Sequence, residues 1–131
     1  MSIYSISIVV PVYNSERSLP LLVERLAAVL PTIASDYEVI LVNDDSRDAS
    51  SAVMDQLARQ HAWIRPFSLM RNYGQHNALL CGIRQARMDV IVTMDDDLQN
   101  PPEEIPKLLA KMDEGFDAVY GYPKKESHGF L

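Results

Sequence analysis

The sequence predicts an α/β domain in which a mostly parallel sheet carries helices on both faces. Short β-branched runs alternate with segments in which apolar residues recur at helical spacing, as in parallel strands joined by helical crossovers. The runs are apolar almost without interruption, which is typical of strands buried on both faces. With 131 residues, 47% of them hydrophobic and 23% charged, the chain has the size and composition of one globular domain.

The elements follow one another in a regular order. The run at residues 6–12 leads into polar residues and predicts a strand that ends in a loop. A helix is expected next, with Ser18 as its cap and Pro20 in its first turn, because apolar residues recur at helical spacing as far as Pro31. Further strands are expected at residues 37–42, 64–69, 90–94 and 118–122, and further helices at 49–60, 75–87 and 102–114.

The formal net charge of -6 limits the partners of the chain. No nucleic acid is expected as a partner, because phosphate-backbone recognition shows as a basic face or stripe. A smaller phosphate ligand would need a cation beside it. The single cysteine, Cys81, cannot form an internal disulfide, and no apolar run reaches the roughly 20 residues needed to cross a bilayer. We therefore expect a cytoplasmic chain.

Polar residues gather where four predicted strands end, and ligands of open parallel sheets bind beyond these carboxyl ends. The segments concerned are residues 13–16, 43–46, 71–74 and 95–97. A binding site along this edge of the sheet is therefore expected. The loop after the first strand lacks Gly-x-Gly-x-x-Gly, and no Walker-type Gly-Lys-Ser/Thr occurs, which argues against a dinucleotide cofactor of the usual kind.

Three consecutive aspartates, Asp95, Asp96 and Asp97, directly follow an apolar run. Side chains alternate between the faces of a strand, so Asp95 and Asp97 should share a face. Two converging carboxylates repel each other unless a cation neutralises them, and oxygen ligands suit Mg²⁺ or Mn²⁺. The alternative is a solvated acidic turn that caps the following helix.

Residues 43–48 end the second strand and have two interpretations. Asp44, taken as an exposed acid at a strand end, could accept hydrogen bonds from a ribose or a base. The segment could equally be a turn in which Ser46 or Asp48 caps the next helix, because Asp, Asn and Ser favour both places. The residues alone leave the two interpretations balanced.

In this order, the strand-end motifs resemble those of the family 2 glycosyltransferases, which have the GT-A fold, a Rossmann-like arrangement. Residues 11–16 resemble the nucleotide loop of that family, residues 42–48 its Val-Asp-Asp-Gly-Ser-x-Asp segment, and residues 95–97 its Asp-x-Asp. Asn43 replaces the first acid of this segment and Asp45 its glycine. If that glycine is left-handed, Asp45 can follow at modest cost, because Asp tolerates this conformation.

Residues 71–78 and 97–106 resemble the subgroup that transfers sugars to polyprenyl phosphates, and especially the bacterial undecaprenyl-phosphate transferases of aminoarabinose derivatives. The resemblance implies that Asp97 and Gln99 coordinate the metal and that Asp95 lies close to the donor. Asp95 and Asp97 are then the expected catalytic residues. Asp95 is also a further candidate ligand of the metal. The nucleotide-binding residues that it implies are Pro11, Tyr13, Asn14, Glu16, Asp44, Arg71 and Asp96. Arg71 would lie near the diphosphate as a fixed positive charge.

The implied reaction is transfer of a sugar from a nucleoside diphosphate, with uridine favoured over guanosine, to polyprenyl phosphate with inversion and metal assistance. Residues 1–122 would form the donor part, and residues 123–131 the start of a missing acceptor part or a disordered tail. The parent protein would lie at the cytoplasmic face of the inner membrane, and an uncovered sheet edge would favour a homodimer. The alternatives are a non-catalytic nucleotide-sugar-binding module and a sugar-nucleotide nucleotidyltransferase.

Overall fold

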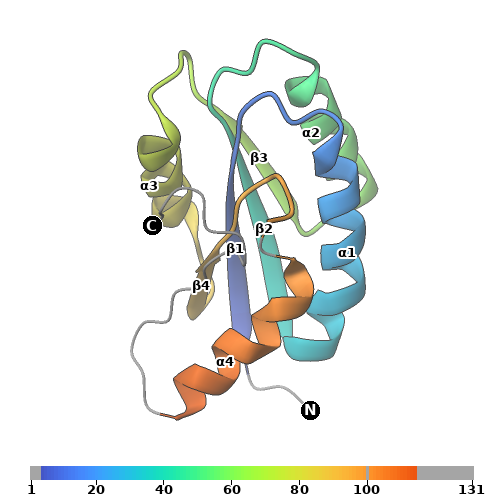
Figure 1. Ribbon diagram of the computed structural model, residues 1–131, viewed down its shortest axis with the longest axis vertical. Coiled ribbons are helices and arrows are strands. Elements are labelled where there is room, and N and C mark those ends of the chain that lie inside the picture. Colours follow the sequence, from blue (N-terminus) through green and yellow to red (C-terminus); the bar gives the residue numbers. More distant parts are fainter. Residues whose placement is uncertain (1–3, 100, 115–131) are drawn as a thin grey trace.

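The computed structural model describes residues 4–99 and 101–114 and contains one parallel sheet there (Figure 1). Its strands are β1 (Ser5–Val12), β2 (Asp36–Asn43), β3 (Ile64–Ser68) and β4 (Val90–Thr93), in the order β3-β2-β1-β4. All pairs are parallel. The predicted α/β class is confirmed, whereas the strand expected at residues 118–122 lies outside the described residues.

Helices cover both faces of the sheet, as predicted. The helical elements are α1 (Ser18–Ile33), α2 (Ser50–Gln60), α3 (Gln75–Gln85), the short 3-10 helix η1 (Pro102–Glu104) and α4 (Ile105–Asp113). Figure 1 shows α1 and α2 on one face and α3 on the other. None of the helices in the described ranges is long and apolar enough to cross a membrane.

The two central strands, β1 and β2, are buried on both faces along most of their length, and most of their residues are apolar. In β1 the side chains of Ile6, Ile8 and Val10 belong to the core on the side of α1, whereas Val9 belongs to a second cluster with Ala78 of α3. This alternation is the period of two expected of a strand. The apolar runs of the sequence therefore mark strands that carry a core on each face.

Helix α3 packs unusually close to the sheet at Gly82. A β-carbon at this position would lie 2.4 Å from Cγ1 of Val9 and 3.1 Å from Cγ2 of Val42. Glycine therefore allows the helix to approach β1 and β2. Because α3 begins beside the carboxyl ends of the strands, this packing also fixes the position of its first turn.

Two details of α1 differ from the prediction. The helix continues past Pro31 to Ile33, because a proline near the end of a helix removes one hydrogen bond without blocking the last turn, in which Ala34 N–H donates to the Leu30 carbonyl (3.0 Å). Ser18 is not the cap. It is the first helical residue, and its hydroxyl donates to the Ser15 carbonyl at 3.5 Å.

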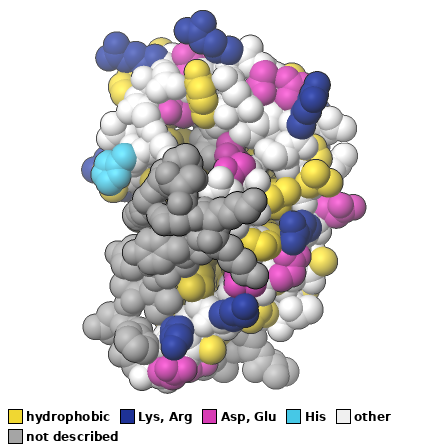
Figure 2. Space-filling model, viewed as in Figure 1, with side chains coloured by type: hydrophobic (Ala, Val, Ile, Leu, Met, Phe, Trp, Pro, Cys, Tyr) yellow, Lys and Arg dark blue, Asp and Glu magenta, His cyan; other side chains and the backbone are white. Residues whose placement is uncertain are grey.

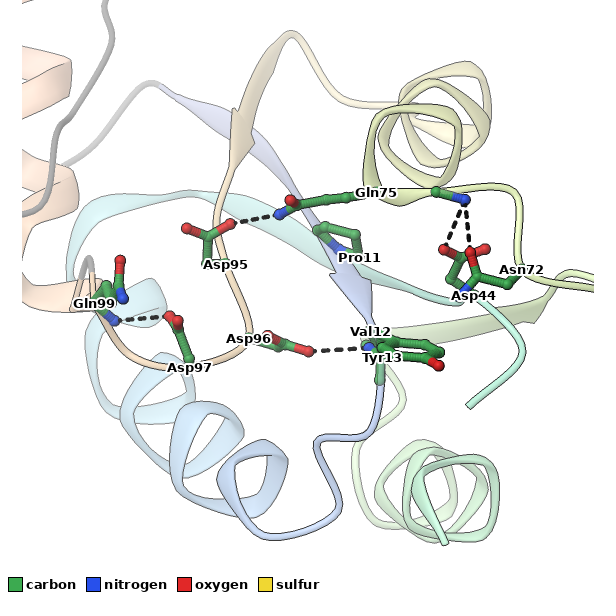
Figure 3. A pocket seen from close by; sticks show the side chains of 11 residues that line it. Pro11, Val12, Tyr13, Asp44, Asn72, Gln75, Asp95, Asp96, Asp97 and Gln99 are labelled. Atoms are coloured by element: carbon green, nitrogen blue, oxygen red, sulfur yellow. Dashed lines mark hydrogen bonds between the residues drawn. The ribbon is translucent and has the colours of Figure 1, made fainter. Parts of the chain in front are cut away.

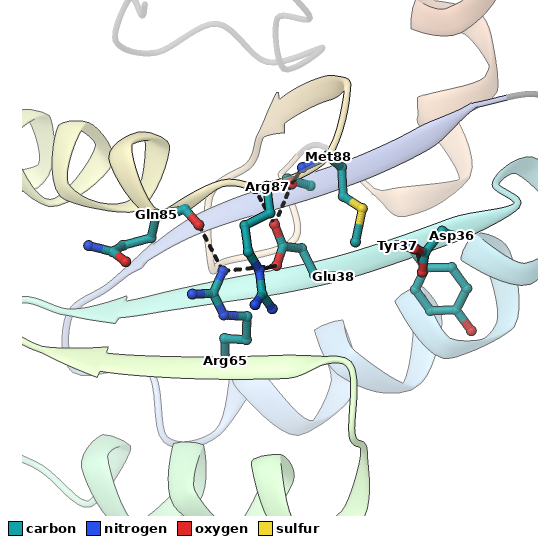
Figure 4. A network of polar contacts seen from close by, with 8 residues as sticks. Asp36, Tyr37, Glu38, Arg65, Gln85, Arg87 and Met88 are labelled. Atoms are coloured by element: carbon teal, nitrogen blue, oxygen red, sulfur yellow. Dashed lines mark hydrogen bonds and ion pairs between the residues drawn. The ribbon is translucent and has the colours of Figure 1, made fainter.

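A buried carboxylate, Glu38, joins the opposite end of the sheet to the connection between α3 and β4 (Figure 4). Its side chain is 3% exposed. It accepts hydrogen bonds from the Ser7 hydroxyl (2.6 Å), Arg65 Nη1 (2.9 Å), and the backbone N–H (2.8 Å) and Nε (3.3 Å) of Arg87. Arg65 also donates to the Gln85 carbonyl (2.7 Å). The network therefore ties the end of α3 and the start of β4 to β1, β2 and β3.

The hydrogen bonds decide the charge state of Glu38. Burial by itself raises the pKa of a carboxyl group, but the bonds from Ser7, Arg87 and Arg65 outweigh it and hold the pKa of Glu38 below its ordinary value. A lowered pKa in the folded state means that the ionised form stabilises the fold. This stabilisation is complete above the pKa of the unfolded chain and is lost as the pH falls through the folded-state pKa.

We expect Glu38→Gln to lower the free energy of unfolding at pH 7 by about 1 to 3 kcal/mol, because it leaves two arginines without their shared acceptor charge. The difference from the wild type should shrink as the pH falls below about 4.5, the ordinary pKa of a Glu. Urea unfolding from pH 3 to 7 measures both effects. The exposed Glu24→Gln is the control and should follow the wild type. Curves for Glu38→Gln and wild type that stay parallel at all pH values would contradict the role of the charge.

Candidate active site

A cavity of about 390 Å³ lies at the carboxyl ends of the strands, where β1 and β4 separate. The chain passes from β1 to β2 and β3 in one direction and then returns to place β4 on the other side of β1. This reversal is the topological switch point, where ligands of open parallel sheets bind. The described lining residues come from all four strand-end segments of the sequence and are Pro11, Val12, Tyr13, Asp44, Asn72, Gly74, Gln75, Asp95, Asp96, Asp97 and Gln99 (Figure 3).

Pro11 helps to open this cavity. The carbonyl of Val9 accepts a hydrogen bond from Met94 on the β4 side, and the carbonyl of Val12 accepts one from Asp44 on the β2 side. Because these directions alternate along a parallel strand, the position of the missing N–H of Pro11 is on the β4 side. Paired residues of β4 end at Thr93, opposite Val9. Proline therefore occurs where β1 has no neighbour to bond, and the cavity begins there.

Asp44 is buried, which corrects the expectation of an exposed acid at the strand end. The residue is 3% exposed. Its Oδ1 accepts the N–H of Tyr73 (2.7 Å) and its Oδ2 accepts the N–H of Gly74 (3.0 Å), immediately before α3 begins. The positive end of the α3 dipole and these two donors offset the desolvation of the charge. Each oxygen keeps a second lone pair, so Asp44 can hold this loop and still face a ligand.

We expect Asp44→Ala to lower the free energy of unfolding by about 1 to 3 kcal/mol, because two backbone donors lose their charged acceptor. Asp45→Gly is the matched control. Asp45 is exposed and has a φ of 57°, which glycine adopts without strain, so the control should be as stable as the wild type or more so. Chemical denaturation measures both. Unchanged stability of Asp44→Ala would show that the carboxylate does not anchor the loop.

The three consecutive aspartates point in different directions, which corrects the expectation that Asp95 and Asp97 share a strand face. Strand β4 ends at Thr93, so the alternation of a strand does not extend to the aspartates. Asp95 accepts a hydrogen bond from Gln75 Nε2 (2.9 Å), and Asp97 accepts one from the backbone of Gln99 (3.1 Å) (Figure 3). Both still line the same cavity.

Asp96 joins the turn after β4 to the loop after β1. Its Oδ2 accepts hydrogen bonds from the backbone of Tyr13 (3.1 Å) and from the Ser15 hydroxyl. Burial raises the pKa of Asp96, and the charge of Asp97 adds to this, although the two hydrogen bonds act in the opposite direction. A positive charge in the cavity would favour the ionised form. Asp96 thus fixes the loop that presents Tyr13.

Three predicted nucleotide-binding residues are not among the described lining of the cavity. Asn14, at a φ of 51°, accepts the N–H of Arg47 (2.8 Å), and Glu16 accepts the N–H of Ala49 (3.2 Å). Both side chains therefore tie the loop after β1 to the loop after β2. The third, Arg71, has its guanidinium 5.1 Å from the centre of the Tyr73 ring.

The loop after β2 combines the two interpretations that the sequence left open. Asp48 accepts hydrogen bonds from Ser50 N–H (2.9 Å) at the start of α2 and from Glu16 N–H (3.2 Å), which lower the pKa of its carboxyl group although burial opposes this. Asn43 accepts the N–H of Ser46 (3.0 Å). Asp45 adopts the left-handed conformation that the sequence allows at this position, with a φ of 57°. Turn chemistry thus holds the loop, and Asp44 alone of this segment reaches the described cavity lining.

Sequence reasoning did not assign Val12, Asn72, Gly74 or Gln75 to the site. Asn72 and Gly74 belong to the polar segment 71–74 after β3, and Gln75 belongs to the resemblance segment 71–78, but their residue types alone predict only a turn and a helix start. Gly74 has a φ of 96°, which side chains rarely adopt, although a β-carbon there would meet no atom within 4 Å. The only sequence signal for this part of the site was Gly74 itself, because a glycine directly before an amphipathic helix indicates a backbone conformation that other residues rarely adopt.

The segment after β4 that carries Asp95, Asp96, Asp97 and Gln99 is called the acidic turn below. A divalent cation fits this turn when a diphosphate supplies further ligands. The carboxylates of Asp95 and Asp97 and the amide oxygen of Gln99 are hard oxygen donors, which Mg²⁺ and Mn²⁺ prefer. In residues 4–99 and 101–114, no group of three or more His, Cys, Asp or Glu side chains is arranged to hold an ion alone. Mg²⁺ is commonly bound through one or two carboxylates together with substrate phosphates. The donor set matches that pattern.

The family follows from comparison of the whole chain. Residues 7–130 match the sequence pattern of Glycosyl transferase family 2. The chain belongs to this family. Family 2 membership was predicted from the strand-end motifs, and it places the acidic cavity in a family of sugar-transferring enzymes. The loop after β1, the loop after β2 and the turn with the three aspartates all lie inside the matched residues.

Curated relatives are close in sequence but longer. The chain is 48% identical over 119 residues to the undecaprenyl-phosphate 4-deoxy-4-formamido-L-arabinose transferase of Enterobacter sp. (strain 638), covering 90% of this chain and 36% of that protein. It is 49% identical over 120 residues to the enzyme of the same name from Pseudomonas fluorescens (strain Pf0-1), covering 89% and 35%. The chain thus spans about a third of the length of these relatives.

Solved structures confirm the predicted GT-A type of fold. TarS 1-349 of S. aureus in complex with UDP-GlcNAc superposes with a TM-score of 0.68 at 25% identity, over 84% of this chain and 31% of that one. The mannosyltransferase PcManGT of Pyrobaculum calidifontis, in complex with GDP-Man and Mn²⁺, gives a TM-score of 0.64 at 20% identity, over 70% and 27%. At that identity the second likeness concerns the fold alone.

Proposed function

We propose that this chain binds a uridine diphosphate sugar and that the protein transfers the sugar to a polyprenyl phosphate. The observation that carries the proposal is the acidic cavity at the switch point of a family 2 chain. The acceptor is inferred from the two undecaprenyl-phosphate transferases at 48% and 49% identity. Transfer is an activity of the whole protein, whereas donor binding is assigned to this chain, with residues 1–122 as its donor part.

The nucleoside would occupy the end of the cavity at Tyr13 and Asp44. Tyr13 is 44% exposed, so its ring is accessible for stacking, and Asp44 can accept a hydrogen bond from a base or ribose. Uridine is favoured over guanosine because TarS, at 25% identity, is solved with UDP-GlcNAc. Pro11 and Asp96 support this end by shaping the loop after β1. Asn14 and Glu16 would act indirectly, through the same loop.

The diphosphate would lie at the acidic turn, with a divalent cation. We propose that Asp97 and Gln99 hold Mg²⁺ or Mn²⁺ and that Asp95 is a third ligand or lies beside the donor. When bound, the cation supplies a Lewis acid that stabilises negative charge on the departing diphosphate. The described cavity lining contains aspartates and no Lys or Arg. A bare diphosphate would therefore be repelled.

The acceptor explains why the site needs no general base. A phosphate monoester has a second pKa of about 6, so it is already a charged nucleophile at neutral pH. A parent protein at the cytoplasmic face of the inner membrane would meet a lipid phosphate there. A homodimer stays a prediction.

Two rival functions are separated by different observations. A sugar-nucleotide nucleotidyltransferase would need a glycine-rich loop with Arg or Lys after β1, and residues 13–16 do not provide one. A non-catalytic nucleotide-sugar-binding module would bind the donor without transfer. Binding and transfer must therefore be measured separately.

We expect UDP to bind the chain at least tenfold more tightly with Mn²⁺ than with a chelator, because the acidic cavity repels an unscreened diphosphate. Asp97→Asn should remove most of this gain. Isothermal titration calorimetry measures both affinities, and the exposed Asp55→Asn on α2 is the control. Equal affinity with Mn²⁺ and with chelator would contradict the metal-assisted site.

We expect the protein to form a lipid-linked product when labelled UDP-sugar, Mn²⁺ and undecaprenyl phosphate are supplied together. Asp95→Asn and Asp97→Asn should lower the rate at least 100-fold, because stabilisation of the leaving diphosphate is typically worth 10²-fold or more. Extraction of labelled lipid and thin-layer chromatography measure the product. Tight donor binding by the full-length protein without any lipid-linked product would favour the binding module instead.

A further inference from the structure

Gln75 is the one described residue of the cavity whose side chain reaches from α3 to the acidic turn. Its Nε2 donates to Oδ1 of Asp95 at 2.9 Å, and Figure 3 shows the two side chains pointing toward each other. The two residues are 20 positions apart in the sequence and come from different elements. The contact therefore joins α3 to the turn that would hold the cation.

We propose that Gln75 is a positioning residue that orients the Asp95 carboxylate for the cation of the donor complex. The inference rests on the proposed function of the acidic turn. An amide that donates to a carboxylate oxygen holds that carboxylate in one orientation. Such partners behind a metal-binding carboxylate commonly change metal affinity by 10- to 100-fold.

The position of Gln75 is itself fixed from the nucleoside end of the cavity. Asp44 accepts the N–H groups of Tyr73 and Gly74, the two residues directly before Gln75. Gly74 adopts a φ of 96°, which turns the chain into the first residue of α3. A chain of contacts thus runs from Asp44 through the loop to Gln75 and on to Asp95. These contacts connect Asp44, at the nucleoside end of the cavity, with Asp95, at the end proposed for the cation.

A neutral amide suits this place better than a charged group. A Lys or Arg at position 75 would neutralise Asp95 and compete with the cation, whereas a second carboxylate would repel it. Glutamine donates a hydrogen bond and leaves the net charge of the turn unchanged. The side chain is exposed and lies in the first turn of α3, so its replacement removes no core contact.

The test compares the gain in UDP affinity on adding Mn²⁺ in four single variants of the chain and one double variant, Gln75→Met combined with Asp95→Ala. Gln75→Met keeps the length of the side chain and removes the donor, and Gln75→Asn keeps the amide but is too short to reach Asp95. His76→Ala, an exposed neighbour on the same turn, is the control, and Asp95→Ala removes the acceptor. Calorimetry with UDP, once with Mn²⁺ and once with chelator, gives the gain for each. Thermal unfolding checks that each variant is folded.

We expect both Gln75 variants to reduce the Mn²⁺-dependent gain about tenfold, at the lower end of the effect of such partners, while UDP affinity in chelator stays within about twofold of the wild type. His76→Ala should behave as the wild type. In an Asp95→Ala background, Gln75→Met should have no further effect, because the residue acts through Asp95.

Three results would overturn the inference. The first is an unchanged Mn²⁺-dependent gain in both Gln75 variants. The second is a loss of UDP affinity that is as large in chelator as with Mn²⁺, which would mean that Gln75 contacts the nucleotide or supports the fold. The third is a full effect of Gln75→Met in the Asp95→Ala background. A wild-type chain without any Mn²⁺-dependent gain would overturn the proposed function of the turn, and this inference with it.

Discussion

The parallel pairing of β1 with β2 on one side and β4 on the other is the constraint on which the rest of the structure depends. It brings the carboxyl ends of the strands to one edge and reverses the direction of the crossovers at β1, which puts α3 on the opposite face from α1 and α2. The pairing with β2 covers eight residues, from Ser5 to Val12, whereas the pairing with β4 stops at Val9. The unequal lengths leave β1 uncovered just where the cavity begins.

Packing and polar contacts hold this arrangement from two ends. At the far end, Glu38 ties the start of β4 to the sheet through Arg87 and Ser7. After β4, Glu103 of η1 pairs with Arg25 of α1 at 2.5 Å, so the segment that follows the acidic turn is bound to α1. Figure 2 shows acidic and basic side chains interspersed over one face of the described surface. The turn with the three aspartates is therefore anchored on both sides, by the contacts of Glu38 before β4 and by the pair of Glu103 with Arg25 after the turn.

The fold was largely predictable because its signal is repeated along the chain. Each of the four described strands began and ended within about one residue of its predicted range, since each is a short, largely apolar run bounded by polar residues. The cap of α1 was not predictable in the same way. Ser18 has the right residue type for a cap, but in the structure it is the first helical residue. The loop before it is held by the contact of Ser15 with Asp96, two groups far apart in the sequence.

The site was predictable as a set of segments and less so as a set of side chains. Parallel strands end at one edge, so residues 13, 44, 72–74 and 95–97 had to lie near one another. Beyond the last paired residue of a strand, side chains no longer alternate between the two faces, and local hydrogen bonds decide where each side chain points. Asp44 consequently turned inward to the loop before α3, and Asp97 folded back on Gln99. Gln75 was missed because its importance depends on a partner 20 residues away.

The aspartates of the cavity act on the fold as well as on any ligand. Asp44 holds the loop before α3, and Asp96 holds the loop after β1, each through backbone N–H groups of another segment. Their charges would be costly near one another in a partly buried cavity, and these donors offset only part of that cost. On the function proposed above, a cation that enters with a diphosphate would supply the missing positive charge. The same carboxylates that arrange the loops of the cavity would then make its affinity for an anionic nucleotide depend on a metal.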